Sequence, residues 1–239
     1  MQLAVVTGGT RGLGLAISKK LVSEGYKVIV VGRKQSEECK EWVLATENAV
    51  FEAFDFANTD EIHAFSKNIV KKYGRPYALV NNAAVGLDGV LATMHESDIS
   101  KAIKVNIEAP CLLTKYLIRP MLINQTGRII NISSIIGSTG FKGLAVYGAT
   151  KAALNGFTKS LSREVGKAGI TVNSVAPGYM ATEMTEGLEG EKLESIKRRS
   201  PLGRLAHVDD VASMVNYLLS EEAKSVTGTV ITVDAGSTA

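Results

Sequence analysis

Thr7-Gly8-Gly9-Thr10-Arg11-Gly12-Leu13-Gly14 is the stretch that decides the fold. It follows a short apolar run, residues 3–6, of the kind expected for a buried parallel strand, and it opens a helical pattern with Leu13, Ile17 and Leu21 as its apolar stripe. Small residues at such a turn let the backbone approach a pyrophosphate, and the following helix N-terminus offers unpaired N–H groups. A plain tight turn also explains a glycine-rich loop, but its position between a first strand and a helix favours phosphate binding.

The second predicted strand, residues 28–31, ends in Gly32-Arg33-Lys34 with no carboxylate. In a dinucleotide-binding fold, an acidic residue here accepts from the ribose 2′-OH of NAD, whereas arginine suits the 2′-phosphate of NADP. Arg33 and Arg11 could hold one phosphate together through charge-assisted hydrogen bonds. Both are also explained as solvated surface arginines. The missing carboxylate favours NADP(H) as the cofactor.

Strands and helices alternate along the rest of the chain. Further strands are predicted at residues 50–54, 77–80, 128–132, 170–175 and 230–233, and helices at 37–46, 60–72, 96–124, 147–169 and 208–220. Such alternation with right-handed crossovers predicts an α/β fold, a doubly wound parallel sheet of about seven strands with helices on both faces. We expect residues 1–239 to form one domain, with a substrate lid carrying a short helix at about 179–205.

Composition excludes several classes of protein. Of 239 residues, 45% are hydrophobic and 21% are charged, as in ordinary globular proteins. The 27 basic and 24 acidic residues are spread along the chain and leave a net charge of +3, so we expect no nucleic-acid partner. No apolar run approaches the ~18–20 residues that span a bilayer, and the N-terminus does not resemble a signal peptide. We therefore expect a cytoplasmic protein with no membrane partner.

Cysteines and histidines give no sign of a metal site. Cys39 and Cys111 lie far apart and outside any Cys-x-x-Cys pattern, so we expect neither a disulfide framework nor zinc, and predict that both are buried. His63, His95 and His207 are isolated from one another and are expected at the surface or at helix edges.

Polar residues follow several predicted strands at the edge where open α/β sheets bind ligands. Asn81-Asn82-Ala83-Ala84 suits backbone bracing beside a flat ligand or a simple tight turn, and Ser134 follows a later strand. Asn106 lies inside the predicted helix 96–124, where asparagine is disfavoured, so it either faces solvent or has a particular hydrogen-bonding task. Pro110 is expected to kink this helix.

Tyr147 and Lys151 are four positions apart at the start of a predicted helix. Residues at i and i+4 share one helix face, so the phenol and the ammonium group can converge on one point. A nearby lysine stabilises the phenolate and is expected to lower a tyrosine pKa that is about 10 in water, which would make the hydroxyl a usable proton donor near neutral pH. Such pairs are also common on amphipathic helix surfaces.

Together these residues resemble the short-chain dehydrogenase/reductase family, in its shorter single-domain form, over essentially the whole chain. Residues 7–14 fit the family's TGxxxGxG loop, and residues 81–84 resemble its NNAG stretch, with Ala84 where glycine is usual. Ser134, Tyr147 and Lys151 fall at the spacing of the catalytic serine, tyrosine and lysine. The resemblance therefore implies a Rossmann fold and hydride transfer between a nicotinamide cofactor and a carbonyl.

The resemblance also implies a role for each site residue. Tyr147 would give a proton to the developing alkoxide, Ser134 would hold the carbonyl oxygen, and Lys151 would bind the nicotinamide ribose. Asn106 matches the fourth catalytic position and would support a water chain to Lys151, while Asp55 would bond the adenine amino group. The cofactor-binding residues that the resemblance implies are Gly8, Gly9, Thr10, Arg11, Gly12, Leu13, Gly14, Arg33, Asp55, Phe56, Asn82, Ala83, Ala84, Tyr147, Lys151, Pro177, Gly178, Met180 and Thr182.

Within the family, residues 85–91, 200–204 and 227–236 look most like 3-oxoacyl-[acyl-carrier-protein] reductases. That likeness implies an NADPH-dependent enzyme of fatty acid synthesis, a carbonyl substrate that is small or bound to an acyl carrier, and a homotetramer. Two alternatives stay open. One is a short-chain reductase or dehydrogenase of another small carbonyl, sugar or polyol, and the other is a non-catalytic NADP sensor.

Overall fold

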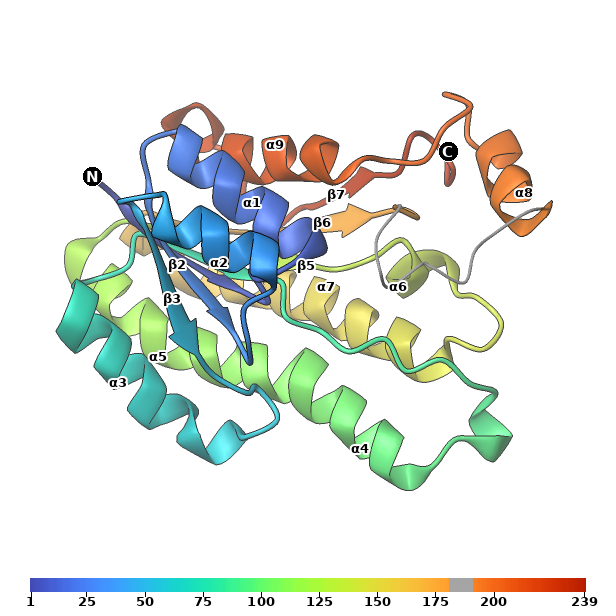
Figure 1. The fold of residues 1–239 in the computed structure, drawn as a ribbon, viewed down its shortest axis with the longest axis horizontal. Coiled ribbons are helices and arrows are strands. Elements are labelled where there is room, and N and C mark those ends of the chain that lie inside the picture. Colours follow the sequence, from blue (N-terminus) through green and yellow to red (C-terminus); the bar gives the residue numbers. More distant parts are fainter. Residues whose placement is uncertain (181–190) are drawn as a thin grey trace.

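Short runs rich in valine and isoleucine form one sheet of seven parallel strands, in the order β3-β2-β1-β4-β5-β6-β7 (Figure 1). The computed structural model describes residues 1–180 and 191–239. The strands are β1 Leu3–Thr7, β2 Lys27–Gly32, β3 Ala49–Ala53, β4 Ala78–Asn81, β5 Gly127–Ile132, β6 Ile170–Pro177 and β7 Val230–Val233. The predicted doubly wound parallel sheet is confirmed.

Helices pack on both faces of this sheet. They are α1 Gly12–Ser23, α2 Glu37–Leu44, α3 Ile62–Tyr73, α4 Glu96–Ile103, α5 Ala109–Asn124, α6 Ile136–Thr139, α7 Ala145–Val165, α8 Glu191–Arg199 and α9 Val208–Leu219. In Figure 1, α1, α2 and α9 lie above the sheet, and α3, α5 and α7 lie below it. Within the described ranges, no helix is long and apolar enough to cross a membrane.

Each face of the sheet has its own hydrophobic core. The core under α1 and α9 contains Leu21 and Val215, and the opposite core contains Leu117 of α5 and Val165 of α7. Because strands such as β5 are covered on both sides, all their residues are buried, which explains their continuous apolar runs. Full burial of one such leucine or valine contributes about 1.5–3 kcal/mol.

The prediction of one continuous helix at 96–124 was wrong. α4 and α5 are separated by a π-helical turn, Lys104–Glu108, and Pro110 lies in the first turn of α5 rather than at a kink inside one helix. Proline has no N–H to donate to the carbonyl four residues earlier, so the ordinary α-helical bond to Asn106 cannot form. The change of hydrogen-bond register therefore falls just before the proline.

One further expectation needs correction, and two are confirmed. Residues Ile136–Thr139 form a short helix, α6, whose Ile136 N–H donates to the Ser134 hydroxyl at 3.2 Å. Cys39 is buried as predicted, but Cys111 is only partly buried because it lies on a less covered side of α5. The three histidines are exposed, as expected.

Asp234, directly after β7, organises the last turn of the chain. Its carboxylate accepts hydrogen bonds from the Gly236 N–H at 2.9 Å, the Ser237 hydroxyl at 2.9 Å, and the Thr238 N–H and hydroxyl at 2.9 and 2.7 Å. Burial alone raises the pKa of Asp234, but these bonds outweigh it and hold the pKa below its usual value. The Ser200 hydroxyl donates to the Ala235 carbonyl at 2.6 Å, so the same turn holds the segment after α8.

We predict that Asp234→Asn lowers the free energy of unfolding by about 1–3 kcal/mol at pH 7, because the charged acceptor of these hydrogen bonds is lost. A lowered folded-state pKa means that the stabilisation is present above the unfolded-state pKa and is lost as pH falls through the folded-state value. Urea unfolding should therefore separate variant from wild type at pH 7 and bring them together below about pH 4. Asp60→Asn, at an exposed position, is the control. An equal difference at both pH values would contradict the prediction.

Candidate active site

The predicted site residues lie at the carboxyl edge of the sheet. The sequence order of the strands reverses between β1 and β4, which pair directly, so the loops that follow these two strands are neighbours. Ligands of open α/β sheets bind at such a switch point. The glycine loop follows β1, residues 82–84 follow β4 and Ser134 follows β5.

The glycine loop forms a cradle in which Gly8 and Gly14 leave no room for a side chain. Gly8 has a φ of 62°, which glycine adopts readily. A Cβ on Gly14 would lie 2.1 Å from the Gly8 carbonyl oxygen. Helix α1 begins at Gly12, and the first N–H groups of a helix have no partner within it. Close backbone approach and a helix N-terminus fit a pyrophosphate group.

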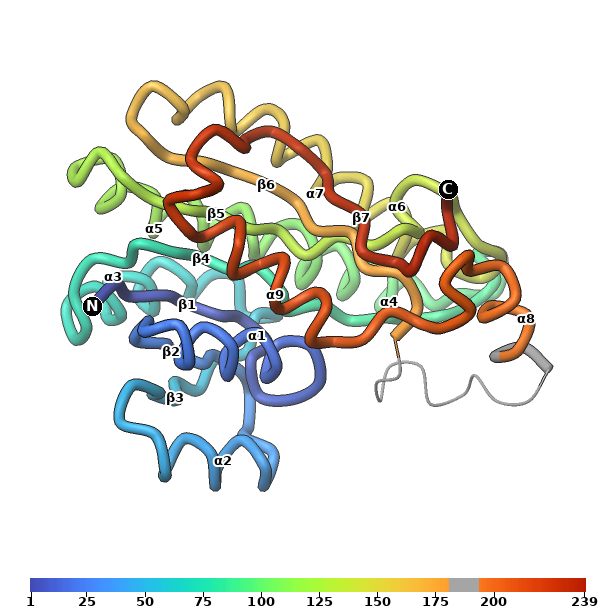
Figure 2. Tube along the Cα trace, turned by 90° about the horizontal axis from the view of Figure 1, so that it is seen from above, coloured from blue at the N-terminus to red at the C-terminus, as the bar shows by residue number. Residues whose placement is uncertain are grey.

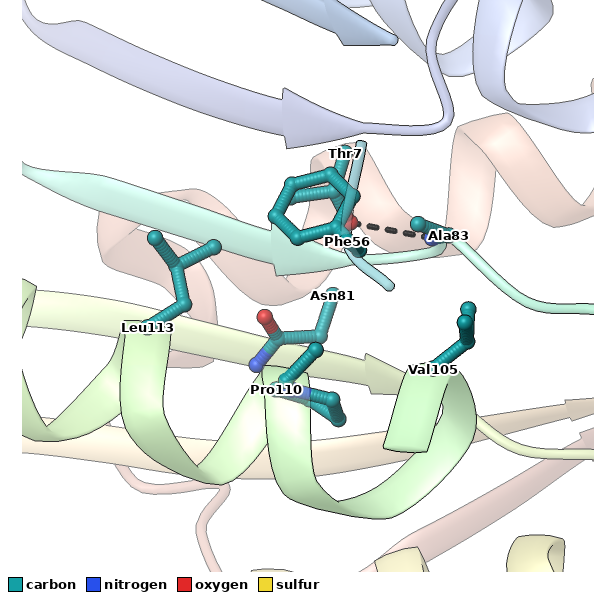
Figure 3. Close-up of a pocket in the computed structure, with 8 residues that line it drawn as sticks. Thr7, Phe56, Asn81, Ala83, Val105, Pro110 and Leu113 are labelled. Atoms are coloured by element: carbon teal, nitrogen blue, oxygen red, sulfur yellow. Dashed lines mark hydrogen bonds between the residues drawn. The ribbon is translucent and has the colours of Figure 1, made fainter. Parts of the chain in front are cut away.

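A set of hydrogen bonds braces this cradle from the neighbouring strand. The Thr7 hydroxyl accepts from the N–H groups of Asn82 and Ala83, each at 2.9 Å, and Figure 3 shows the bond from Ala83. The Asn82 side-chain amide donates to the carbonyls of Thr7 at 2.9 Å and Gly8 at 3.1 Å. Asn82 thus braces the backbone of the glycine loop, and its place beside a flat ligand stays a prediction. Thr7 was not among the predicted site residues, although a threonine at the end of the first strand was a usable signal.

Phe56 was predicted to bind the cofactor, but its side chain lies in the protein interior. Its ring is buried and packs edge-on against Phe54, with 5.1 Å between ring centroids. With Thr7 and Asn81 it lines a cavity of ≈ 10 Å³, room for at most about one water (Figure 3). A cofactor contact of Phe56 would have to come from its backbone. The neighbouring Asp55 carboxylate accepts from the Ala57 N–H at 3.0 Å.

The loops that carry the two predicted phosphate-binding arginines touch each other. The Ser36 hydroxyl donates to the Thr10 carbonyl at 2.7 Å. A Cβ on Gly32 would lie 2.8 Å from the Thr10 side chain, so the end of β2 packs directly on the glycine loop. Arg11 and Arg33 are both exposed on these adjoining loops.

Tyr147 and Lys151 share one face of α7. The Lys151 ammonium lies 5.6 Å from the centre of the Tyr147 ring and donates to the Ile132 carbonyl at 2.9 Å. Lys151 is only 3% exposed, so it is far from an ordinary amphipathic surface residue. The Ser134 hydroxyl lies close enough to the Tyr147 phenol to lower its pKa in part. The structure thus brings Ser134, Tyr147 and Lys151 together.

The predicted lowering of the Tyr147 pKa was wrong for this structure. Burial raises the pKa of Tyr147 to about 12, the Ser134 hydroxyl lowers it in part, and the Asp88 carboxylate raises it further. Burial also lowers the pKa of Lys151 to about 8. The physical reason is that the ammonium group bonds the Ile132 carbonyl, while both side chains are withdrawn from water.

Asn106 sits in the π-helical turn and joins two parts of the site. Its side-chain oxygen accepts from the Val85 N–H at 2.8 Å, and its amide donates to the Val85 carbonyl at 2.9 Å and to the Thr150 hydroxyl at 3.1 Å. Thr150 in turn donates to the Tyr147 carbonyl at 2.8 Å. The hydrogen-bonding task predicted as one alternative is confirmed. Thr150, which the sequence did not single out, completes this link.

The last predicted cofactor-binding residues follow β6. Pro177 ends this strand, and Gly178 packs so closely on Asp234 that a Cβ would lie 2.6 Å from the Asp234 Cβ. Met180 forms an isolated β-bridge with Ala206. Thr182 lies outside the described residues.

We predict that Gly14→Ala weakens binding of a nicotinamide dinucleotide about tenfold or more, because the new methyl group would force the Gly8 carbonyl out of place. Titration calorimetry would measure it. The matched control is Gly156→Ala on α7, where a Cβ meets nothing within 4 Å. Equal affinity of the Gly14→Ala variant and the wild type would show that the cradle does not hold the dinucleotide.

Comparisons with known proteins agree with this geometry. A family model described as enoyl-(acyl carrier protein) reductase matches residues 8–238. The chain is 37% identical to the 3-oxoacyl-[acyl-carrier-protein] reductase of Vibrio cholerae, over 98% of this chain and 96% of that protein. It is 38% identical to the Haemophilus influenzae enzyme of the same name, over 98% and 97% of the two chains.

The fold also matches a solved structure. A proposed gluconate dehydrogenase from Agrobacterium tumefaciens superimposes with a TM-score of 0.93 at 24% identity, over 99% of this chain and 95% of that one. At this identity the match concerns the fold alone. From the family model and the curated relatives together, the chain belongs to the short-chain dehydrogenase/reductase family and is an oxidoreductase that acts on CH–OH groups.

Proposed function

We propose that the chain is a 3-oxoacyl-[acyl-carrier-protein] reductase of fatty acid synthesis that uses NADPH. The observation that carries the proposal is the convergence of Ser134, Tyr147 and Lys151 beside the β1/β4 switch point. The names of the curated relatives support the substrate class. The matching family model is named for an enoyl reduction, but a tyrosine and a serine hydroxyl side by side suit a carbonyl oxygen that must be held and protonated.

The proposed cofactor is NADP(H), which supplies the hydride when bound. The cradle at Gly8 and Gly14 would take the pyrophosphate, and Arg11 and Arg33 would take the 2′-phosphate. Lys151 would bind the nicotinamide ribose. The support for NADP over NAD is the contact between the loops of the two arginines and the absence of a carboxylate in Gly32-Arg33-Lys34.

Proton delivery would fall to Tyr147. A phenol with a pKa of about 12 holds its proton near neutral pH but is a weak acid, so donation to the oxygen of a carbonyl that is being reduced needs a positive charge close to the phenol oxygen. Ser134 would hold that oxygen. Lys151, with a pKa of about 8, is still mostly charged at pH 7 and would stabilise the phenolate once its ammonium group turns from the Ile132 carbonyl toward the Tyr147 oxygen.

Asn106 would act mainly by positioning. Both hydrogens of its side-chain amide are engaged, with Val85 and with Thr150. A proton-relaying water would therefore have to meet one of its oxygens. Because Thr150 bonds the Tyr147 carbonyl, the same contacts hold the start of α7 in place beside the loop after β4.

Several further properties belong to this proposal. We propose that the substrate is carried on an acyl carrier, that the enzyme works in the cytoplasm as a homotetramer, that residues 179–205 form a substrate lid, and that Thr182 contacts the cofactor. Residues 181–190 of this segment lie outside the described residues. A reductase of another small carbonyl, sugar or polyol is the main alternative. A non-catalytic NADP sensor would have no need for Ser134 beside the Tyr147 hydroxyl.

We predict that the chain oxidises NADPH when given an acetoacetyl thioester, and that Tyr147→Phe lowers this rate about 10²–10⁴-fold while NADPH binding is kept. The loss of NADPH absorbance measures the reaction. Brisk reduction of a sugar or steroid ketone with no reduction of the thioester would overturn the proposed substrate. Tight NADPH binding without reduction of any carbonyl in a broad panel would favour the sensor.

We predict that Arg33→Asp lowers kcat/KM with NADPH about tenfold or more, while activity with NADH falls much less or rises, because a carboxylate repels the 2′-phosphate and accepts from the 2′-OH. Steady-state kinetics with both cofactors at one ionic strength would measure the ratio. Lys34→Asp, at the next exposed position, makes the same charge change and is the control. An equal loss with both cofactors would mean that Arg33 does not contact the 2′-phosphate.

A further inference from the structure

A buried serine beside the candidate site has no part in the proposed chemistry. Ser133 lies directly after β5, is 3% exposed, and precedes Ser134 in the chain. Its N–H donates to the Val175 carbonyl of β6 at 2.8 Å, so its backbone is fixed by the sheet. Its hydroxyl donates to the Lys151 carbonyl of α7 at 3.1 Å. Ser133 thus joins the sheet to the helix at the residue that carries the ammonium group of the site.

Two hydrogen bonds connect Lys151 to the end of β5, one at each end of the lysine residue. The Ser133 hydroxyl donates to the Lys151 carbonyl, and the Lys151 ammonium group donates to the Ile132 carbonyl at 2.9 Å. Because Ile132 and Ser133 are neighbours in the chain, the two bonds close a ring through the whole lysine. A lysine side chain is a flexible four-carbon stem, so its ammonium group has a defined position only where its backbone is also held.

The Lys151 carbonyl does not depend on Ser133 for its own hydrogen bonding. Inside an α-helix such as α7, it accepts from the N–H four residues later, and a carbonyl oxygen has two lone pairs. Removal of the Ser133 hydroxyl would therefore leave this carbonyl with a partner. The bond from Ser133 is an additional one, and its effect is to set how closely the helix approaches the end of the strand.

The segment that follows Ser134 packs directly on the same turn of α7. A Cβ on Gly137 of α6 would lie 2.9 Å from both the Ala152 nitrogen and the Lys151 carbonyl carbon. The backbones of α6 and α7 therefore touch with no side chain of Gly137 between them. Figures 1 and 2 show α6 beside the first turns of α7, at the carboxyl end of β5. A shift of α7 at Lys151 would thus also move the helix relative to Ser134.

We infer that Ser133 is a positioning residue for the reaction: its hydroxyl fixes the backbone of Lys151 to the end of β5 and so sets where the ammonium group stands beside Tyr147. The ammonium group lies 5.6 Å from the centre of the Tyr147 ring. Because the interaction between charges weakens with distance, a shift of the helix would change how well this group stabilises a phenolate. The catalytic consequence rests on the proposed function, in which Lys151 stabilises the Tyr147 phenolate.

The test follows Lys151 itself, by NMR titration of isotope-labelled lysine side chains, in which Lys151→Met identifies the signal. Among the described residues, burial is the only cause that lowers the pKa of Lys151 to about 8, so a higher pKa reports entry of water. Tyr147, with a pKa of about 12, keeps its proton across this range. We expect the Lys151 signal to titrate at a higher pH in Ser133→Ala than in the wild type, because the released backbone lets the ammonium group reach water.

Ser174→Ala is the matched control. Ser174 is fully buried in β6, and its hydroxyl bonds the Asn131 carbonyl at 3.0 Å and the Asn155 side chain at 3.2 Å rather than Lys151. Ser133→Thr keeps the hydroxyl and is expected to titrate like the wild type. Equal titration of Ser133→Ala and the wild type, or an equal rise in Ser174→Ala, would overturn the inference. A rise in Ser133→Thr as large as in Ser133→Ala would assign the effect to packing and overturn it as well.

Kinetics test the catalytic consequence. We expect Ser133→Ala to lower kcat about fivefold with NADPH and a reducible carbonyl, while the KM for the carbonyl stays within about twofold, because Ser133 acts on Lys151 and not on the substrate. An unchanged kcat, or a rise in KM alone, would contradict this consequence. If the wild type reduced no carbonyl, the proposed function would fail by itself, and the titration would still decide whether Ser133 positions Lys151.

Discussion

The hydrogen bonds between Thr7 and the Asn82–Ala83 backbone hold together the two loops on which the site depends. One loop follows β1 and forms the glycine cradle, and the other follows β4 and leads to Val85. Asn106 extends the chain of contacts from Val85 to Thr150 and so to α7. A single run of short polar contacts thus links the phosphate cradle to the candidate proton donor, across residues that are distant in sequence.

The electrostatics of the site follow from its burial. Lys151 is almost fully withdrawn from water, which lowers its pKa, and Tyr147 is buried enough for its pKa to rise. Both shifts favour the neutral form of the group, as desolvation always does. The pKa of Tyr147 would fall only if a positive charge lay closer to its oxygen than the Lys151 ammonium does. That ammonium group bonds the Ile132 carbonyl instead. The resting site therefore holds the Tyr147 proton, and a positive charge nearer the phenol oxygen would be needed to release it.

The fold could be predicted from the sequence because its local signals agree with one another. A strand covered on both faces must be apolar throughout, and a glycine turn between such a strand and a helix has few structural meanings. The candidate site was readable where residue type and position coincide, as at Ser134 and Tyr147. How deeply each side chain is buried could not be predicted from the sequence. The spacing of Tyr147 and Lys151 indicates a shared helix face, but the burial of Lys151 depends on β5, which is distant in the sequence. Asp88, in an exposed loop, belongs to no periodic pattern at all.

The π-helical turn at Lys104–Glu108 is, in terms of chain length, one residue more than a regular helix would need there. Each residue of an α-helix turns the chain by about 100°. Deleting one residue from this turn could restore an unbroken helix, and it would rotate Asn106 away from Val85 and Thr150 relative to α5. The extra residue therefore sets the direction of the Asn106 side chain. The contacts with Val85 and Thr150 depend on the length of this turn as much as on the asparagine itself.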